Sequence, residues 1–279
     1  MFEPARRRKL AALSARALGT RLGCALALLT AFASTSSAQN CIEPGCDPSE
    51  ITEWSTSVVS LVRGPVDLMI PALGYVTHGD PLDIPGAATG IPTDAVSLGD
   101  GGSVTVQFAT PFRDGPDFDF AVFENGISSG GGLLYMELGF VEVSSNGVDF
   151  ARMPTLTSRV DPLWPLQEAD PDDYAGFAGH REVGTGSEFD LSDLLGHPLE
   201  VSGDLDLQAI AYVRIIDVIG NASTYDSMSN PVHDPYPTQF LVGGMDIDAV
   251  GAIYVPEPGF AWSALVGALF LRTMRQRRA

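Results

Sequence analysis

The sequence predicts an all-β protein, a single antiparallel β-sandwich of the jelly-roll type, flanked by a signal peptide and a C-terminal apolar helix. Short runs of alternating apolar and polar residues are separated by Gly, Pro, Asn and Asp, and no long stretch has the helical period. Basic, apolar segments occur only at the two ends. We therefore expect a signal peptide at 1–38, one sandwich domain at 39–254 and a separate tail at 255–279.

The N-terminal segment has the order of a secretory signal. A basic stretch around Arg6–Lys9 precedes the apolar run LGCALALLTAF, and the small residues Ser36-Ser37-Ala38 follow. The mature chain is expected to begin near Gln39. The alternative is an N-terminal anchor that is never cleaved. Lipoprotein processing at Cys24 is disfavoured, because most of the apolar run comes after that cysteine.

Charge is strongly partitioned along the chain. Residues 39–258 contain 34 of the 35 acidic residues and only six arginines, which gives this part a net charge of −28. Such a surface repels nucleic acid and anionic membranes and attracts cations, so nucleic-acid binding is excluded. The only lysine, Lys9, lies in the signal segment, which also excludes Ser-Lys nucleophiles, Schiff-base chemistry and a phosphate-binding P-loop.

Cys41 and Cys46 are the cysteines that remain after signal removal. In an exported chain, an even pair this close predicts a small disulfide loop. A metal site is the alternative, but two thiolates without a nearby histidine are too few ligands for zinc.

The alternating segments give the expected elements of the sandwich. Asp161 to Gly186 is rich in Pro, Asp and Gly and is expected to be a long surface excursion. Residues 189–196 suit one short helical turn capped by Asp190. Seven segments are predicted to be strands: 57–62, 66–70, 103–108, 118–123, 139–144, 211–219 and 247–255.

Two of these segments carry a family resemblance. The segment GFVEVSSNGVDF places Val141 and Val143 on one face and then turns at Asn146-Gly147, a pair suited to a tight hairpin. In AYVRIIDVI, Tyr212 and Arg214 face away from Val213 and Ile215. This order resembles the galactose-binding-like jelly rolls, which include discoidin-type and carbohydrate-binding modules. The resemblance implies a jelly roll, with sugar binding left to variable loops.

The C-terminal tail has three parts. Pro256-Glu257-Pro258 precedes the apolar run GFAWSALVGALFL, and a basic terminus follows, with Arg272, Arg275, Arg277 and Arg278. This order resembles the PEP-CTERM sorting signal of exported bacterial proteins. The resemblance implies transient insertion in the inner membrane, processing near the motif by an exosortase-type enzyme, and release to the cell surface or extracellular matrix.

The physical properties of the tail agree with this interpretation. The two prolines interrupt regular structure, and the arginines favour a cytoplasmic C-terminus. Thirteen apolar residues make a helix of about 20 Å, which is shorter than the roughly 30 Å hydrocarbon core. The alternative is an ordinary C-terminal membrane anchor that is not processed.

Acidic side chains near strand ends are candidate calcium ligands. Calcium takes six to eight oxygen ligands, and neighbouring carboxylates repel one another without a cation. In a strand beginning at Asp117, that residue and Asp119 would share one face. The alternative is a solvated acidic surface. The candidates are Asp114, Asp117, Asp119, Glu124, Asn125, Asp217, Asp246 and Asp248.

Catalytic motifs are missing from the sequence. The four histidines form no HExxH, and there is no GxSxG. His180, beside Arg181, is expected to be a hydrogen-bonding loop residue rather than a base. A glycosidase needs only two suitably separated carboxylates, so a secreted glycan-acting hydrolase stays open as an alternative.

Aromatic side chains offer a further candidate site. Trp164 lies in the long excursion and is the better platform for stacking on a sugar, with Tyr174 and Tyr236 behind it. The alternative for Trp164 is packing of its loop onto the sheet. The sequence thus predicts a non-catalytic exported surface or matrix protein with a calcium-stabilised sandwich. A carbohydrate-binding module for exopolysaccharide is the first alternative.

Overall fold

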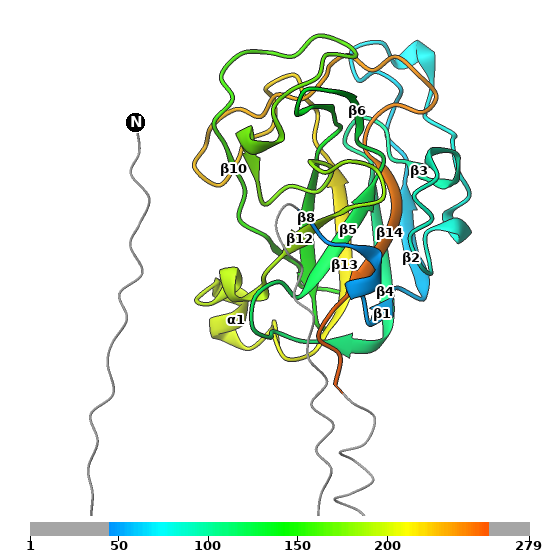
Figure 1. Cartoon of the computed structure of the whole chain (residues 1–279). Coiled ribbons are helices and arrows are strands. Elements are labelled where there is room, and N and C mark those ends of the chain that lie inside the picture. Colours follow the sequence, from blue (N-terminus) through cyan, green and yellow to red (C-terminus); the bar gives the residue numbers. More distant parts are fainter. Residues whose placement is uncertain (1–44, 257–279) are drawn as a thin grey trace, which may run out of the picture. The chain divides into compact units, whose positions relative to one another are not determined.

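Residues 45–256 of this computed structural model form mainly antiparallel strands joined by loops and short helical turns (Figure 1). The structure describes these residues only. The predicted signal peptide, Cys41 and the tail from Glu257 onward lie outside them. Among residues 45–256, no helix has both the length and the apolar character needed to cross a membrane.

The first of two five-stranded sheets has the order β1-β14-β5-β12, and β3 also pairs with β14. All of its pairs are antiparallel. Strand β14 therefore lies inside the sheet, with strands paired on both of its edges. The strands are β1 (Glu53–Trp54), β3 (Val96–Ser97), β5 (Phe120–Glu124), β12 (Gly186–Phe189) and β14 (Asp246–Ala252).

The second sheet has the order β2-β4-β13-β8-β9, again with antiparallel pairs. At its centre, Val213 and Ile215 of β13 are buried, whereas Tyr212 and Arg214 are half-buried on the other face, as predicted. The strands are β2 (Ser57–Val62), β4 (Ser103–Phe112), β8 (Gly139–Ser144), β9 (Ala151–Arg152) and β13 (Ile210–Asp217).

One apolar cluster joins the two sheets. Phe112 of β4 lies 5.3 Å from Phe120 of β5, and Phe120 stacks on Phe189 of β12 at 5.0 Å between ring centroids. Valines from β4, β8 and β13 complete the same cluster. Burying these side chains is the main favourable contribution to the stability of the fold, at roughly 1.5–3 kcal/mol for each large residue.

The smaller elements lie around the two sheets, with β6 at one end of the long strands and α1 at the other (Figure 1). Two small sheets of two strands each pair β6 (Ile127–Gly130) with β7 (Leu133–Tyr135), and β10 (Leu156–Thr157) with β11 (Tyr174–Ala175). The helical turns are η1 (Pro48–Glu50), η2 (Pro71–Leu73), η3 (Pro81–Asp83), η4 (Pro92–Asp94), η5 (Pro171–Asp173), η6 (Leu191–Leu194) and α1 (Pro198–Ser202).

The stretch 161–186 differs from the predicted surface excursion. Leu163, Ala169, Tyr174 and Phe177 are buried, and together with Phe140 of β8 and other residues they form a second apolar cluster. Its high proline and aspartate content reflects turns between short buried segments. This stretch is therefore not an exposed excursion, because it packs against β8 through a second buried apolar cluster.

Six predicted strands are present, two of them, 57–62 and 139–144, with the predicted bounds. The strand predicted at 66–70 is wrong. There the Asp67 carboxylate accepts a hydrogen bond from the Met69 N–H at 2.7 Å, and the chain forms a local turn instead of pairing with a neighbouring strand.

The predicted hairpin at Asn146-Gly147 joins β8 to β9. Its turn is longer than two residues. The Asn146 side-chain oxygen accepts hydrogen bonds from the N–H groups of Val148 and Asp149, and Gly147 has a φ of 76°.

Candidate metal centre

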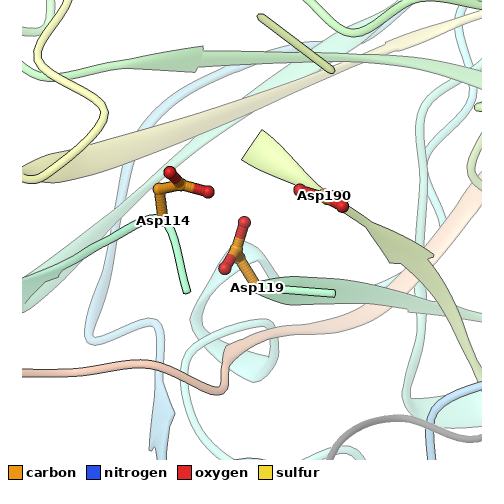
Figure 2. Close-up of side chains that lie close together, drawn as sticks. All are labelled: Asp114, Asp119 and Asp190. Atoms are coloured by element: carbon orange, nitrogen blue, oxygen red, sulfur yellow. The ribbon is translucent and has the colours of Figure 1, made fainter. Parts of the chain in front are cut away.

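Three segments far apart in the sequence bring Asp114, Asp119 and Asp190 together, and we call these residues the triad. Asp114 comes shortly after β4, Asp119 directly before β5, and Asp190 directly after β12. Because Phe120 of β5 pairs with Phe189 of β12, the two flanking aspartates lie at the same edge. One carboxylate oxygen from each residue lies within 4.8 Å of the others. Figure 2 shows the three carboxylates gathered between these segments.

Local hydrogen bonds hold the triad in place. The Asp119 side chain is fully buried and accepts hydrogen bonds from the Gly115 N–H at 2.7 Å and the Leu191 N–H at 2.6 Å. Asp190 caps η6 by accepting a hydrogen bond from the Ser192 N–H at 2.8 Å, as the sequence predicted. The Oδ1 atom of Asp114 is buried and has no hydrogen-bond partner among the described residues.

The electrostatics of the triad are unfavourable without a positive charge. Burial raises the pKa of Asp119 to about 7, although the two N–H donors oppose the shift, and the charges of Asp190 and Asp114 raise this pKa further. Burial and the charge of Asp190 also raise the pKa of Asp114. At an effective dielectric of about 20, two unit charges 4.8 Å apart repel by about 3.5 kcal/mol.

Four of the arginines near the sheets form ion pairs away from the triad. Among residues 45–256, the arginine ion pairs go to Glu142, Asp173 and Glu188, and none goes to the triad. All the side-chain donor atoms of the triad are carboxylate oxygens, and one of them, Asp114 Oδ1, has no hydrogen-bond partner among the described residues. Such a set suits a hard divalent cation such as Ca²⁺, whose remaining ligands would be backbone carbonyls or water.

Two of the eight candidate ligands predicted from the sequence, Asp114 and Asp119, belong to the triad. Asp117 does not belong to it. The strand predicted here is present, but its predicted start at Asp117 is wrong, because β5 starts at Phe120 and Asp117 lies in a bend with a φ of 67°. Its side chain is exposed, whereas Asp119 is buried, so the two do not share a face.

Four further candidates, Glu124, Asn125, Asp217 and Asp246, lie at the opposite end of β5 from the triad. Asp248 does not join them. Its carboxylate accepts hydrogen bonds from the Thr89 and Gly90 N–H groups at 3.1 and 2.8 Å, so it closes a loop. A bulge in the β5–β14 pairing separates the surroundings of Asp246 and Asp248.

Sequence reasoning missed three acidic residues as candidate ligands. Asp190 was recognised only as a cap, and its place in the triad depends on the β5–β12 pairing. Glu137 and Asp234 are buried, but they lie in segments without strand periodicity, so no pattern distinguished them from the other acidic residues.

Trp164, the predicted aromatic platform, is 75% exposed and does not pack onto a sheet. The Gln167 side chain accepts a hydrogen bond from its N–H at 3.0 Å. Tyr174, in contrast, is buried in the second apolar cluster and cannot be part of a platform. Close in sequence to Trp164, Leu166 and Glu168 line an open recess of about 670 Å³ together with Ile127, Leu133 and Tyr135.

A second recess, of about 370 Å³, lies beside the triad, and Asp190 forms part of its wall. His180, also in this wall, is buried, and its Nδ1 lies 2.6 Å from the Phe177 carbonyl oxygen. Burial lowers the pKa of His180 to about 4. The ring is therefore neutral at physiological pH and hydrogen-bonded within its loop, as predicted.

Cys46 is buried and takes part in a disulfide. Its expected partner, Cys41, lies outside the described residues, so the pairing stays a prediction. The Cys46 backbone also pairs with Gly186 of β12 through two hydrogen bonds, of 2.9 and 2.8 Å.

Comparison with known proteins adds no family to these observations. No protein-family model matches the chain. No curated protein matches it either. The role of the chain must therefore follow from its residues and their geometry.

Proposed function

We propose that this chain is a non-catalytic exported protein of the cell surface or extracellular matrix, stabilised by Ca²⁺ and sorted through its C-terminal tail. The triad is the observation that carries the structural part. It contains a fully buried carboxylate and a buried oxygen without a hydrogen-bond partner, and none of the ion pairs found among residues 45–256 involves its carboxylates. A bound cation would offset the repulsion between the three carboxylates.

The finer fold assignment, a jelly-roll sandwich, is part of this proposal. Two five-stranded antiparallel sheets that contribute to one apolar cluster support it. In such a fold, loops at the ends of the sheets are the natural positions for ion and ligand sites.

The sorting part rests on the tail sequence. Its first motif residue, Pro256, is exposed and lies outside regular structure, four residues after the end of β14. A processing enzyme of the exosortase type needs such an accessible segment. Transient insertion of the following apolar segment in the inner membrane would present the motif to that enzyme.

Thermal unfolding in EDTA and across a calcium titration tests the structural part. A ligand that binds only the folded state stabilises it by about 2.7 kcal/mol at 100 times its Kd, so we expect a Tm increase of several degrees. Asp114→Asn should remove most of the increase that the triad contributes, while leaving the Tm in EDTA unchanged or higher.

Asp117→Asn is the matched control, because Asp117 is close in sequence, exposed and outside the triad, and asparagine tolerates its positive φ. It should keep the full response to calcium. If magnesium or plain salt reproduces the Tm increase, or if Asp114→Asn responds like the parent chain, the triad is not a calcium site.

Replacement of Pro256-Glu257-Pro258 by three alanines tests the sorting part. We expect unprocessed protein to accumulate in the inner membrane, as detected by fractionation and a shift in mass. Normal release of this variant would refute sorting through the motif.

A carbohydrate-binding function for exopolysaccharide is a second candidate, favoured by the exposure of Trp164 beside the polar side chain of Gln167. Rings exposed in this way stack on the apolar faces of sugars. We expect Trp164→Ala to abolish retention on a polysaccharide affinity gel without changing the Tm. Release of reducing ends by the parent chain would instead identify the glycan-acting hydrolase.

A further inference from the structure

A second set of carboxylates lies at the opposite end of β5 from the triad. We call it the inner acidic group: Glu124, Glu137, Asp217, Asp234 and Asp246. It is built around three successive residues, Gly244, Met245 and Asp246. The Gly244 N–H donates to Glu137 Oε1 at 2.9 Å, and the Met245 N–H donates to Asp217 Oδ1 at 2.7 Å. Three acidic side chains from three segments are thereby gathered at the start of β14.

Asp234 is tied to the same place. Its Oδ2 accepts a hydrogen bond from the Leu138 N–H at 3.2 Å, and the Leu138 carbonyl in turn accepts one from the Val218 N–H at 2.9 Å. Leu138 and Val218 directly follow Glu137 and Asp217, so the four acidic residues belong to one connected loop structure.

Two glycines make the close approach of these carboxylates possible. Gly244 has a φ of 74°, and a Cβ atom there would lie 2.9 Å from Asp217 Oδ1. A Cβ atom on Gly220 would lie 1.7 Å from Asp234 Oδ1. Side chains at these two positions would push the carboxylates away, so the glycines have a specific role in placing them.

Two buried oxygens at this site have no hydrogen-bond partner among the described residues. Asn125 is 8% exposed, and its Nδ2 lies 3.4 Å from Asp246 Oδ2, so its side chain points to the group while its Oδ1 is unpartnered. Glu124 is 5% exposed, its Oε2 is also unpartnered, and the charge of Asp246 acts on it. Buried polar atoms of this kind normally have a partner, often an ion or a water molecule.

Nearby positive charge is directed elsewhere. His78 and Arg63 both act on Asp246 electrostatically, but neither forms an ion pair with it, and the Arg63 guanidinium donates hydrogen bonds to the backbone carbonyls of His78, Ser97 and Gly79. None of the ion pairs among residues 45–256 involves the inner acidic group. Five acidic residues, four of them buried, therefore lie close enough for their charges to act on one another, and none has an ion-pair partner among residues 45–256.

We propose that the inner acidic group, with the Asn125 side-chain oxygen, binds a second divalent cation, separate from the triad, and that this cation is Ca²⁺. Every available donor is an oxygen, from carboxylates, an amide or the backbone, which is the ligand set of a hard cation. The number of buried donors favours Ca²⁺ over Mg²⁺, because Mg²⁺ usually keeps several of its waters. The cation joins the ends of β5 and β13, the start of β14 and the loops at 137 and 234.

The alternative is that protons, rather than a cation, neutralise the inner acidic group. One substitution distinguishes these two explanations. Glu124→Gln replaces the unpartnered Oε2 by an uncharged amide and imitates a protonated carboxyl group. If a cation is bound, the variant should have a higher Tm than the parent chain in EDTA and a lower Tm in Ca²⁺. If protons neutralise the group, the variant should match or exceed the parent in both conditions, and the proposal would be wrong.

Calcium stoichiometry gives a readout that does not depend on stability. The exported full chain, purified in mild detergent, is dialysed against ⁴⁵Ca²⁺ of known activity. Glu124→Gln and Glu137→Gln should each bind one ion fewer per chain, or bind that ion about tenfold more weakly or worse, since even outer ligands of metal sites contribute 10–100-fold. The conservative Glu137→Gln keeps an acceptor oxygen for the Gly244 N–H, so it serves if Glu124→Gln does not fold.

The controls separate this site from the triad. Asp114→Asn should lose the triad ion and keep the inner ion, and Asp83→Asn, at an exposed position in η3, should lose neither. If only Asp114→Asn loses an ion, the result supports the triad as a site and refutes the inner site. Loss by the two glutamine variants alone would refute the triad and support the inner site.

Discussion

The two ends of β5 carry acidic groups of opposite character. Asp119 directly precedes the strand and belongs to the triad, whereas Glu124 is its last residue and belongs to the inner acidic group. A five-residue strand separates them by only about 15 Å. In the triad, Asp114 and Asp190 are partly exposed, while four of the five inner acids are buried and Asp246 is nearly so.

This difference in solvent access determines how fast a cation bound to the carboxylates would exchange with the solution. A partly exposed set could exchange a bound cation with the surroundings, so its occupancy would follow the external calcium concentration. A cation bound to a buried set would exchange only when loops open, and it would therefore act as part of the fold. Burial raises the pKa values of Glu124, Glu137, Asp217 and Asp234 well above their usual range, and mutual repulsion adds to this effect.

The largest expected effect comes from breaking the strand that both groups share. Phe120 is fully buried at the start of β5 and contacts Phe112 and Phe189. Phe120→Ala should lower the free energy of unfolding by about 3–5 kcal/mol in EDTA, and by more in calcium, because a disturbed β5 would weaken cation binding at both ends. Urea unfolding in the two conditions measures this. A loss confined to calcium would show that the strand matters only through metal binding.

The pH dependence of the metal-free chain should come next in size. In the folded state, burial raises the pKa of Asp119 to about 7 and that of Asp246 to about 6, against an ordinary value near 3.8. Between these values the folded state holds more protons than the unfolded state, so stability falls as pH rises from about 4 to about 7. At about 1.4 kcal/mol per pKa unit, the raised pKa of each residue alone corresponds to a loss on the order of 3–4 kcal/mol.

Calcium should reverse this trend, because the cation favours the ionised carboxylates. Thermal unfolding at pH 5 and pH 8, in EDTA and in calcium, checks the sign. Asp119→Asn should remove the contribution of the triad to the pH dependence of stability in EDTA, and Asp246→Asn should remove part of the contribution of the inner acidic group. A slope in EDTA that neither variant changes would place the titrating groups elsewhere.

A smaller effect, confined to one end, is expected for Gly244→Ala. The positive φ of Gly244 and the 2.7 Å approach of a Cβ to the Gly99 backbone predict a loss of about 1–3 kcal/mol. Calorimetric titration should show weaker binding at the inner acidic group and an unchanged triad. Equal weakening at both ends would mean that the two groups are coupled through β5.

The sequence allowed the long strands to be predicted because their burial alternates. Val213 and Ile215 of β13 face the core while Tyr212 and Arg214 do not, and this pattern is visible without a structure. The same logic failed at 66–70, where the Asp67 side chain forms a turn that apolar residue counts do not reveal. Two-residue strands such as β3 and β9 are too short to have any period.

The acidic sites were predictable only in part, since their ligands come together through long-range pairing. Asp114 and Asp119 are close in sequence, but Asp190 joins them only because β5 pairs with β12. Glu137 and Asp234 reach the inner acidic group through hydrogen bonds to backbone N–H groups in loops. Such bonds depend on loop conformation, which composition and periodicity do not determine.

The interior position of β14 has a mechanical consequence. Its hydrogen bonds to β1 and β5 run across the strand, so a pull on Val255 along the strand axis loads many of them at once rather than one by one. Beyond the strand, the Tyr254 hydroxyl donates to the Pro116 carbonyl and the Ile253 N–H donates to the Asp119 carbonyl at 2.8 Å. Tension applied through the tail would therefore load the hydrogen bonds of β14 in shear, and the contacts of Ile253 and Tyr254 would resist it close to the triad.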